Sequence, residues 1–185
     1  MSSSGFNWCP IFLASNIFKL DIDRWSKNPS DPANYWLAEN GKAGEDQGFI
    51  LDLGCALPVW GVNLRNTHNA DHNDRSTKKF LVRGSLRLEG PWKKLLTANL
   101  HDSRHQDPPP LQALMFEKSV VVTFVKFELL EYWGAGGGLQ YFLMILSPNQ
   151  QGLFLQCQKT LSLTNPSSCL QSQQMVIMGC LHFVL

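Results

Sequence analysis

The sequence of 185 residues has no run of about 18 consecutive apolar residues, the length that a membrane-spanning helix requires. Its formal net charge is only +1, since 16 Lys and Arg residues face 15 Asp and Glu residues. So small a charge does not favour binding to nucleic acid or to an anionic membrane. The basic pairs Lys78-Lys79 and Lys93-Lys94 are short, and we interpret both as solvated positions on strand edges. We therefore predict no nucleic-acid partner and no transmembrane segment.

Patterns that indicate metal or catalytic chemistry are also missing. The 5 cysteines form no Cys-x-x-Cys pair with metal-ligand spacing, and an odd number cannot all pair within one chain. No Gly-x-Ser-x-Gly motif marks a nucleophile, and no histidine is distinguished as its base. The glycine-rich stretch 134–138 lacks the Gly-Lys-Ser/Thr ending of a phosphate-binding loop, and we interpret it as a tight turn between strands. We predict a protein that is not an enzyme.

Charged residues are scarce at both ends of the chain. From Ser147 onwards Lys159 is the only Asp, Glu, Lys or Arg, and the first 20 residues contain only Lys19. Because folded domains carry charge throughout, we predict a domain at 21–146, an N-terminal extension at 1–20 and a low-charge tail at 147–185 outside the core. Both extensions are expected to be poorly structured. The apolar run near the N-terminus follows no basic segment and contains Pro10, so no signal peptide is predicted.

The dominant period between the two ends is two, which is typical of β-strands. The clearest case is the segment around Val125, Phe127 and Leu129, whose apolar side chains alternate with Lys126 and Glu128. Gly and Pro turn signals separate the runs, and no segment shows a helical period with caps. Many short strands without helices favour an antiparallel sandwich or barrel. The expected strands cover 49–53, 59–65, 80–85, 92–96, 120–130 and 139–146.

Three groups of residues together resemble the discoidin domain, also known as the coagulation factor 5/8 type C or galactose-binding-like domain. In the first, Tyr35-Trp36 is followed after a short loop by the letters GFILDLG at 48–54. In the second, a strand and a polar loop lead to Phe80, Val82, Ser85 and Trp92. In the third, the strand at 125–130 is joined through a glycine-rich loop to the last strand. Lys126 stands where the family usually has arginine.

This resemblance implies a fold and a ligand class. The fold is an antiparallel jelly-roll β-sandwich without catalytic residues, which recognises carbohydrate, glycoprotein or a lipid headgroup through loops at one end. An extracellular location is implied in the same way. No bound cofactor is expected, although some galactose-binding-like folds hold a structural calcium ion. An alternative function is a protein–protein interaction or adhesion module without a small-molecule ligand, which would present a contiguous exposed apolar patch.

The candidate ligand-binding residues lie mainly in the polar loop between the second and third predicted strands. Amides, carboxylates and a planar guanidinium can hydrogen-bond sugar hydroxyls or an anion. Such a loop can also satisfy its own backbone through Asx-turns while its arginine and aspartate pair locally, and both interpretations remain open. A tryptophan beside the glycine loop is a candidate either for stacking on a sugar ring or for the core. The candidates are Asn66, His68, Asn69, Asp71, Asn73, Asp74, Arg75 and Trp133.

Metal binding by the same loop has weaker support. The acidic residues lack the Asp-x-Asx-x-Asx-Gly pattern of a calcium loop, so calcium rests on the resemblance alone. The pairs His68/His72 and His101/His105 have the spacing of helical zinc ligands but lie in predicted loops without a third ligand. We expect these four histidines to be polar surface residues.

Overall fold

The computed structural model describes residues 34–44, 47–67, 72–106, 108–146 and 159–162. Its named elements are all β-strands, and every named strand pair is antiparallel. They are β1 (Trp36–Leu37), β2 (Gly48–Asn66), β3 (Arg75–Ser85), β4 (Lys93–Asn99), β5 (Leu111–Gly134), β6 (Gly138–Ile145) and β7 (Lys159–Ser162). The predicted all-β, antiparallel jelly-roll sandwich is confirmed.

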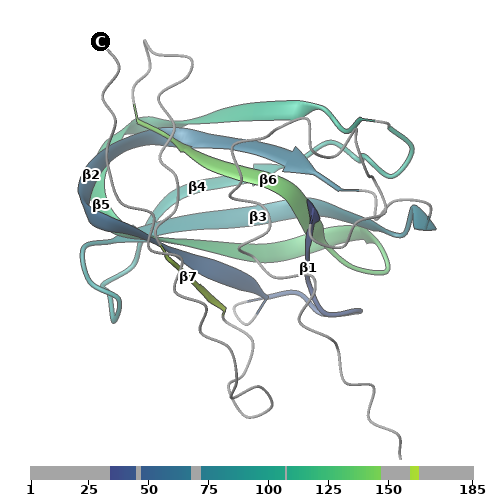
Figure 1. The fold of residues 1–185 in the computed structure, drawn as a ribbon, viewed down its shortest axis with the longest axis horizontal. Coiled ribbons are helices and arrows are strands. Elements are labelled where there is room, and N and C mark those ends of the chain that lie inside the picture. The colour runs from purple at the N-terminus through teal and green to yellow at the C-terminus, as the bar shows by residue number, and fades with distance from the viewer. Residues whose placement is uncertain (1–33, 45–46, 68–71, 107, 147–158, 163–185) are drawn as a thin grey trace, which may run out of the picture.

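The sandwich is formed by two long strands that bend from one layer into the other. The strand order is β1-β6-β2-β5-β3-β4, with β7 paired to β2 off this path. The first part of β2 pairs with the last part of β5 (Gly48↔Glu128), whereas its last part pairs with β6 and with the start of β5 (Arg65↔Leu111). Figure 1 shows β2 and β5 curving together at one end of the molecule. We call the layer that holds β3 and β4 the β3 layer, and the layer that holds β6 and β1 the β6 layer.

Irregular pairing permits the bend. The register between β2 and β5 shifts between Asp52 and Leu57 and again between Val59 and Gly61. Gly54, at the start of the bend, has a φ of 79°, which favours glycine, and its amide donates to Oδ1 of Asp52. At Gly61 a side-chain carbon would lie 2.4 Å from the carbonyl oxygen of Leu114 on the neighbouring strand. Glycine at these two positions therefore lets one strand serve both layers.

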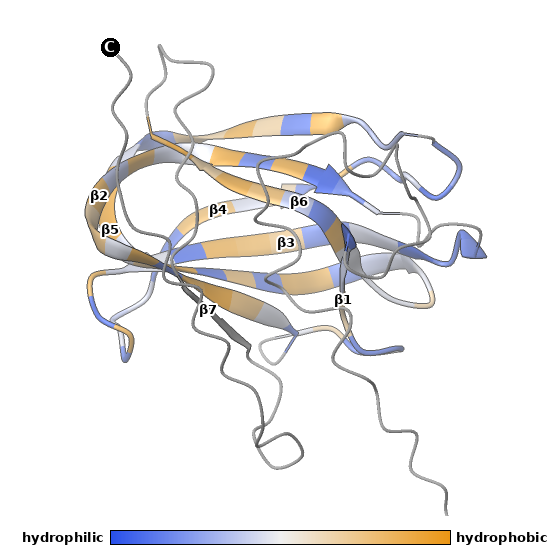
Figure 2. Cartoon of the chain, viewed as in Figure 1, coloured by the Kyte–Doolittle hydropathy of each residue, from blue (hydrophilic) through white to orange (hydrophobic). Residues whose placement is uncertain are grey.

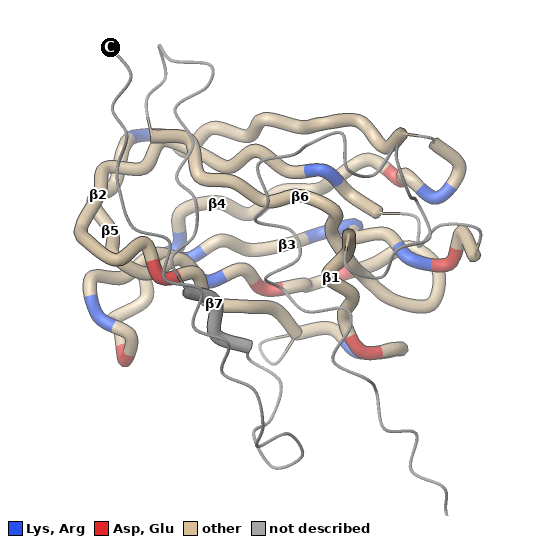
Figure 3. The backbone as a smooth tube through the Cα atoms, viewed as in Figure 1, with Lys and Arg blue, Asp and Glu red and all other residues tan. Residues whose placement is uncertain are grey.

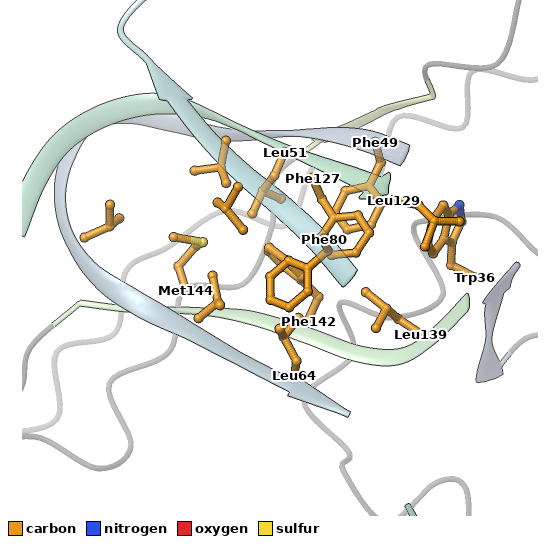
Figure 4. Packing of buried hydrophobic residues seen from close by; sticks show 14 of the residues in the cluster. Trp36, Phe49, Leu51, Leu64, Phe80, Phe127, Leu129, Leu139, Phe142 and Met144 are labelled. Carbon is orange, nitrogen blue, oxygen red and sulfur yellow. The ribbon is translucent and has the colours of Figure 1, made fainter. Parts of the chain in front are cut away.

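The space between the layers is filled by apolar side chains, many of them aromatic (Figure 4). Phe127 stacks on Phe49 and Phe80, with ring centroids 5.1 and 5.3 Å apart. Phe142 of the β6 layer meets Phe49 edge to face at 5.1 Å. Figure 2 shows the alternation of apolar and polar residues along the strands. The two Phe127 stacks join strands within the β3 layer, whereas the Phe142 contact joins the two layers. Each aromatic pair contributes about 0.5–1.5 kcal/mol beyond simple burial.

The predicted strands exist, but several are longer than expected. The runs predicted at 49–53 and 59–65 belong to one strand, β2, and the run at 120–130 is part of β5. Strand β7 comes from the tail predicted to lie outside the core, and it pairs with Phe49–Asp52 of β2. The remaining residues of 1–20 and 147–185 lie outside the described ranges. The domain limits and the expected lack of structure in both extensions stay predictions.

The lysine pairs occupy different positions in the sheet. Lys93 and Lys94 are exposed on β4, at the end of the strand order, as predicted for an edge strand. Lys78 and Lys79 lie instead on β3, which pairs with β4 on one side and with β5 on the other, so the edge interpretation is wrong for this pair. Both ammonium groups lie near the carboxylate of Glu131, with Nζ–O distances of 2.8 and 3.7 Å. Ion pairs with Glu131 on the neighbouring strand β5 therefore account for the two lysines on β3.

Candidate functional site

Several connections meet at one end of the sandwich, which we call the loop end. It comprises residues 38–47, 67–74, 100–110 and 134–138 where these are described, and it lies opposite the bend in Figure 1. The glycine loop lies among the others, because the Ala135 amide donates to the Asp74 carbonyl at 2.7 Å and the Ala135 carbonyl accepts from the Gly41 amide at 3.0 Å. Figure 3 shows charged residues on these loops. This is the end at which the sequence predicts a ligand.

Asn66 is fully buried where β2 ends, and its side chain is occupied by the protein itself. Its Nδ2 donates to the carbonyl oxygens of Thr77 at 2.8 Å and His101 at 3.0 Å. Its Oδ1 accepts from the amides of Thr67 at 3.1 Å and Thr77 at 2.8 Å. All the hydrogen-bonding positions of the amide are thereby used. Of the two interpretations of the polar loop, Asn66 therefore supports the one in which polar side chains bond to the protein's own backbone and not to a ligand.

Arg75 also lies inside the loop end, with only 3% of the residue exposed. Its Nη1 donates to the Ala38 carbonyl at 2.8 Å, and its Nε lies 3.8 Å from Oδ1 of Asp74. Burial lowers the pKa of the Arg75 guanidinium from its ordinary value. A side-chain carbon at Gly136 would lie 2.9 Å from Nη1, so glycine makes room for the guanidinium. The local pair of Asp74 and Arg75 is present, and the guanidinium holds loops together.

The other loop candidates lie nearer the surface. Asn73 is exposed and has a φ of 50°, a left-handed conformation that asparagine tolerates. The side chain of Asp74 is 42% exposed. His68, Asn69 and Asp71 lie outside the described residues, so the structure does not place them. Among the candidates that it does place, Asp74 is the carboxylate that solvent can reach.

Trp133 is half-buried near the end of β5, beside the glycine loop. The ammonium nitrogen of Lys78 lies 4.9 Å from the centroid of its ring, a cation–π contact. The indole Nε1 is buried and has no hydrogen-bond partner among the described residues. One face of the ring is therefore in contact with a cation, which limits how a sugar could stack there.

Asp102 and Arg104, in the loop between β4 and β5, were missed by the sequence analysis. The Arg104 guanidinium binds the carboxylate as a fork: Nε–Oδ1 is 3.0 Å and Nη2–Oδ2 is 2.8 Å. Hydrogen bonds from Arg104 lower the pKa of Asp102 below its ordinary value. The side chains are 32% and 27% exposed, and Arg104 Nη1 would lie 3.3 Å from a side-chain carbon at Gly134. The pair therefore lies at the surface of the loop end, beside the glycine loop.

A local signal for this pair exists in the sequence. Ser103, between the two residues, is fully buried, and its hydroxyl bonds to Ser76 Oγ at 3.1 Å and to the Thr67 carbonyl at 2.9 Å. Because Ser103 points inward, the charged residues on either side of it, Asp102 and Arg104, are left near the surface. The Asp-Ser-Arg triplet alone does not reveal that its loop lies against the glycine loop.

The described residues give no support for a metal site. They contain no group of three or more His, Cys, Asp or Glu side chains that could hold a metal ion. His72, His101 and His105 are exposed, as predicted for polar surface histidines, and His68 is outside the described ranges. Asp71 is also outside them, so the calcium prediction remains untested. No helix in the described part of the chain is long and apolar enough to span a membrane.

Neither a protein-family model nor a curated protein matches this chain. Similar solved structures do exist. A CBM32-3 module from a family 31 glycoside hydrolase of Clostridium perfringens is 12% identical over 68% of this chain and 85% of that chain, with a TM-score of 0.49. The family 32 carbohydrate-binding module of NanJ from C. perfringens, solved with galactose, is 12% identical over 60% and 74% of the two chains, with a TM-score of 0.47.

A third similar structure is the CBM32 of AlyQ, solved with 4,5-unsaturated mannuronic acid. It is 14% identical over 61% of this chain and 78% of that chain, with a TM-score of 0.47. All three of these similar structures are carbohydrate-binding modules. At such identities the likeness concerns the path of the backbone, and site residues do not carry over from one chain to the other.

Proposed function

We propose that the protein is a non-catalytic carbohydrate-binding module that contacts its glycan at the loop end. The observation that carries this proposal is the Asp102–Arg104 fork at the surface. A sugar hydroxyl both donates and accepts a hydrogen bond, so two neighbouring hydroxyls need an acceptor and a donor side by side. A carboxylate held against a guanidinium offers that combination in a fixed orientation. The exposed carboxylate of Asp74 adds a further acceptor at the same end.

The small number of available groups limits the affinity. Asn66 and Arg75 are engaged within the fold, so a single glycan residue meets few charged or amide groups at this end. We expect weak binding of one sugar and stronger binding when several copies, or a multivalent surface, act together. A glycoprotein or a lipid headgroup would present hydroxyls in the same way. These ligand classes and the extracellular location remain predictions from the family resemblance.

A glycan array probed with the full chain tests the proposal. The unmodified protein should bind a subset of the glycans, and Arg104→Gln should weaken that binding by about tenfold or more, because a charge-assisted hydrogen bond is lost. Arg87→Gln is the matched control, since Arg87 is an exposed arginine between β3 and β4, away from the loop end. A folded protein that binds no glycan, or binding that Arg104→Gln leaves intact, would contradict the proposal.

The array also tests the calcium prediction. Each measurement is repeated with calcium and with a chelator present. Loss of binding in the chelator, restored by calcium, would support a structural calcium ion near the loop that contains Asp71. Unchanged binding and an unchanged melting temperature would argue against it.

The alternative, an interaction module for proteins, has no specific structural support. The large exposed apolar side chains among the described residues lie in different places. Leu86 and Leu88 follow β3, Leu111 and Met115 lie in the first part of β5, and Val121 lies at its bend. A protein partner would favour one continuous apolar area.

A further inference from the structure

A hollow lies on the outward side of the β3 layer, away from the loop end, and has a volume of about 240 Å³. It is lined by Arg83 of β3, Lys126 and Glu128 of β5, and Trp92, which precedes β4. We call it the face hollow. Arg83 lies eight residues along β3 from Arg75, roughly 26 Å at about 3.3 Å per strand residue, so the two regions are separate.

The strand period brings the charged groups together. Val82, Val125 and Phe127 point into the core, so Arg83, Lys126 and Glu128 point outward. Arg83 and Lys126 are register partners on adjacent strands, an arrangement in which two positive charges repel each other. Glu128 relieves this repulsion, because its Oε2 lies 3.2 Å from Arg83 Nε and its Oε1 lies 2.6 Å from Lys126 Nζ. The carboxylate fixes both cations at the hollow.

The two cations keep hydrogen-bond donors that Glu128 does not use. Arg83 contributes only Nε to the carboxylate, and its two terminal nitrogens have no hydrogen-bond partner among the described residues. The Lys126 ammonium likewise bonds there only to Glu128, through one of its three hydrogens. Two positive charges and one negative charge leave the hollow with an excess of +1. This excess favours an anionic ligand over a neutral one.

Trp92 adds an aromatic side chain to the charged residues that line the face hollow. The residue is half-buried, so part of its ring remains accessible beside Arg83 and Lys126. The positively polarised C–H groups of a sugar ring are attracted to the negative face of an indole. The volume is below the roughly 300–1,000 Å³ of drug-sized ligand sites, so it suits one residue of a glycan.

We propose that the face hollow binds an anionic sugar residue, with the ring against Trp92 and the acidic group on Arg83 and Lys126. The terminal N–H groups of Arg83 donate to the carboxylate or sulfate as a fork, and Lys126 adds a point charge. This is a second site, independent of the Asp102–Arg104 pair. A chain with both sites would hold an acidic glycan at two separate positions.

A matched pair of ligands tests the proposal on the full chain. Methyl β-glucuronide and methyl β-glucoside differ by the carboxylate, and each is titrated while NMR signals of the protein are recorded. The Nε–H signal of Arg83 and the indole N–H signal of Trp92 report on the face hollow, and the Nε–H signal of Arg104 reports on the loop end. We expect the glucuronide to shift the first two signals at a concentration about tenfold lower than the glucoside. Added salt should weaken the effect.

Substitutions complete the test. Arg83→Gln and Lys126→Gln should each weaken glucuronide binding, read at Trp92, by about tenfold. Lys118→Gln, at an exposed position of β5 outside the hollow, is the matched control and should leave the titration unchanged.

Three results would overturn the proposal. The first is equal binding of the two glycosides at Trp92, and the second is an equal shift by sodium sulfate alone, which would indicate an anion hole without sugar recognition. The third is a glucuronide shift at Arg104 with none at Arg83 or Trp92, which would leave the proposed function intact while removing the second site. A glucuronide shift at Arg83 and Trp92 with no effect of any glycan at Arg104 would support the face hollow and count against the loop end.

Discussion

Polar side chains serve opposite purposes at the loop end and in the face hollow. At the loop end, Asn66 and Arg75 point inward and bond to backbone carbonyls and amides. In the face hollow, Arg83 and Lys126 point outward from the middle of a sheet and bond only to Glu128 among the described residues. The chemical types are similar, and all four residues lie in strands. The difference is that Asn66 ends β2 and Arg75 begins β3, where the strands meet buried loops, whereas Arg83 and Lys126 lie away from the loop end.

That difference follows from the way backbone hydrogen bonds are satisfied. A strand inside a sheet bonds its amides and carbonyls to its neighbours, so its outward side chains have no backbone groups to serve. A buried loop has no such partners, and side chains must supply them. A polar residue where a strand meets buried loops, such as Asn66 or Arg75, is therefore often engaged by the fold itself. A polar residue on the outward side of a strand remains available to a ligand. Three predictions test this contrast.

The largest expected effect is at Asn66. Asn66→Ala removes the partners of the Thr77 amide and of the Thr77 and His101 carbonyls, and it leaves them unsatisfied at a buried position. We expect a loss of about 3 kcal/mol in the free energy of unfolding, measured from urea denaturation. His72→Ala, at an exposed position in the same connection, should change it by less than about 0.5 kcal/mol. Equal effects of the two substitutions would mean that the buried hydrogen bonds of Asn66 do not stabilise the loop end.

A smaller effect is expected at Glu128. Glu128→Gln removes the charge that separates Arg83 from Lys126, while the size of the side chain is kept. Since the Glu128 side chain is only 2% exposed, we expect a loss of about 1–2 kcal/mol in thermal or urea unfolding. Glu117→Gln, at an exposed position of β5, should be nearly neutral. If Glu128→Gln instead raised the free energy of unfolding, the result would contradict the role of the carboxylate in holding Arg83 and Lys126 in place.

The smallest effect concerns the pH dependence at Asp102. Hydrogen bonds from Arg104 lower the pKa of Asp102 in the folded protein, so the folded state binds its proton less readily than the unfolded state. The pair therefore contributes stability above about pH 4, and this contribution is lost as the pH falls through the lowered pKa. It should amount to less than about 1 kcal/mol, because the pair lies near the surface.

NMR titration of the Asp102 carboxyl measures this directly. The carboxyl should titrate below the ordinary range of aspartate in the unmodified protein and return to that range in Arg104→Gln. An unchanged titration would mean that Arg104 is not held against Asp102 in solution, and that the loop end lacks the rigid fork on which the proposed function depends.

The strands were predictable because their signal is local. Alternating residues such as Val125, Lys126, Phe127 and Glu128 indicate a strand and its two faces without knowledge of its neighbours. The lengths were not predictable. Gly54 and Pro58 are turn signals in the sequence, yet the register shifts carry β2 through this segment as one bent strand. Whether a glycine ends a strand or bends it depends on the strand beside it.

The candidate site was predictable only in part, because burial of polar side chains depends on distant residues. The partners of Asn66 include His101, and those of Arg75 include Ala38. The sequence places neither of these two residues near the loop. The face hollow requires the register between Arg83 and Lys126, which are 43 positions apart, and a pattern search along one segment cannot supply it.

The bend of β2 and β5 has a further consequence. Since both strands run through both layers, neither layer can open without disturbing hydrogen bonds in the other. The sandwich therefore has few ways to unfold in part, and its backbone amides should exchange with solvent mainly through complete opening of the molecule. Because β2 and β5 each continue from one layer into the other, the two layers stay connected. Surface residues on either side of the bend can therefore be substituted without separating the layers.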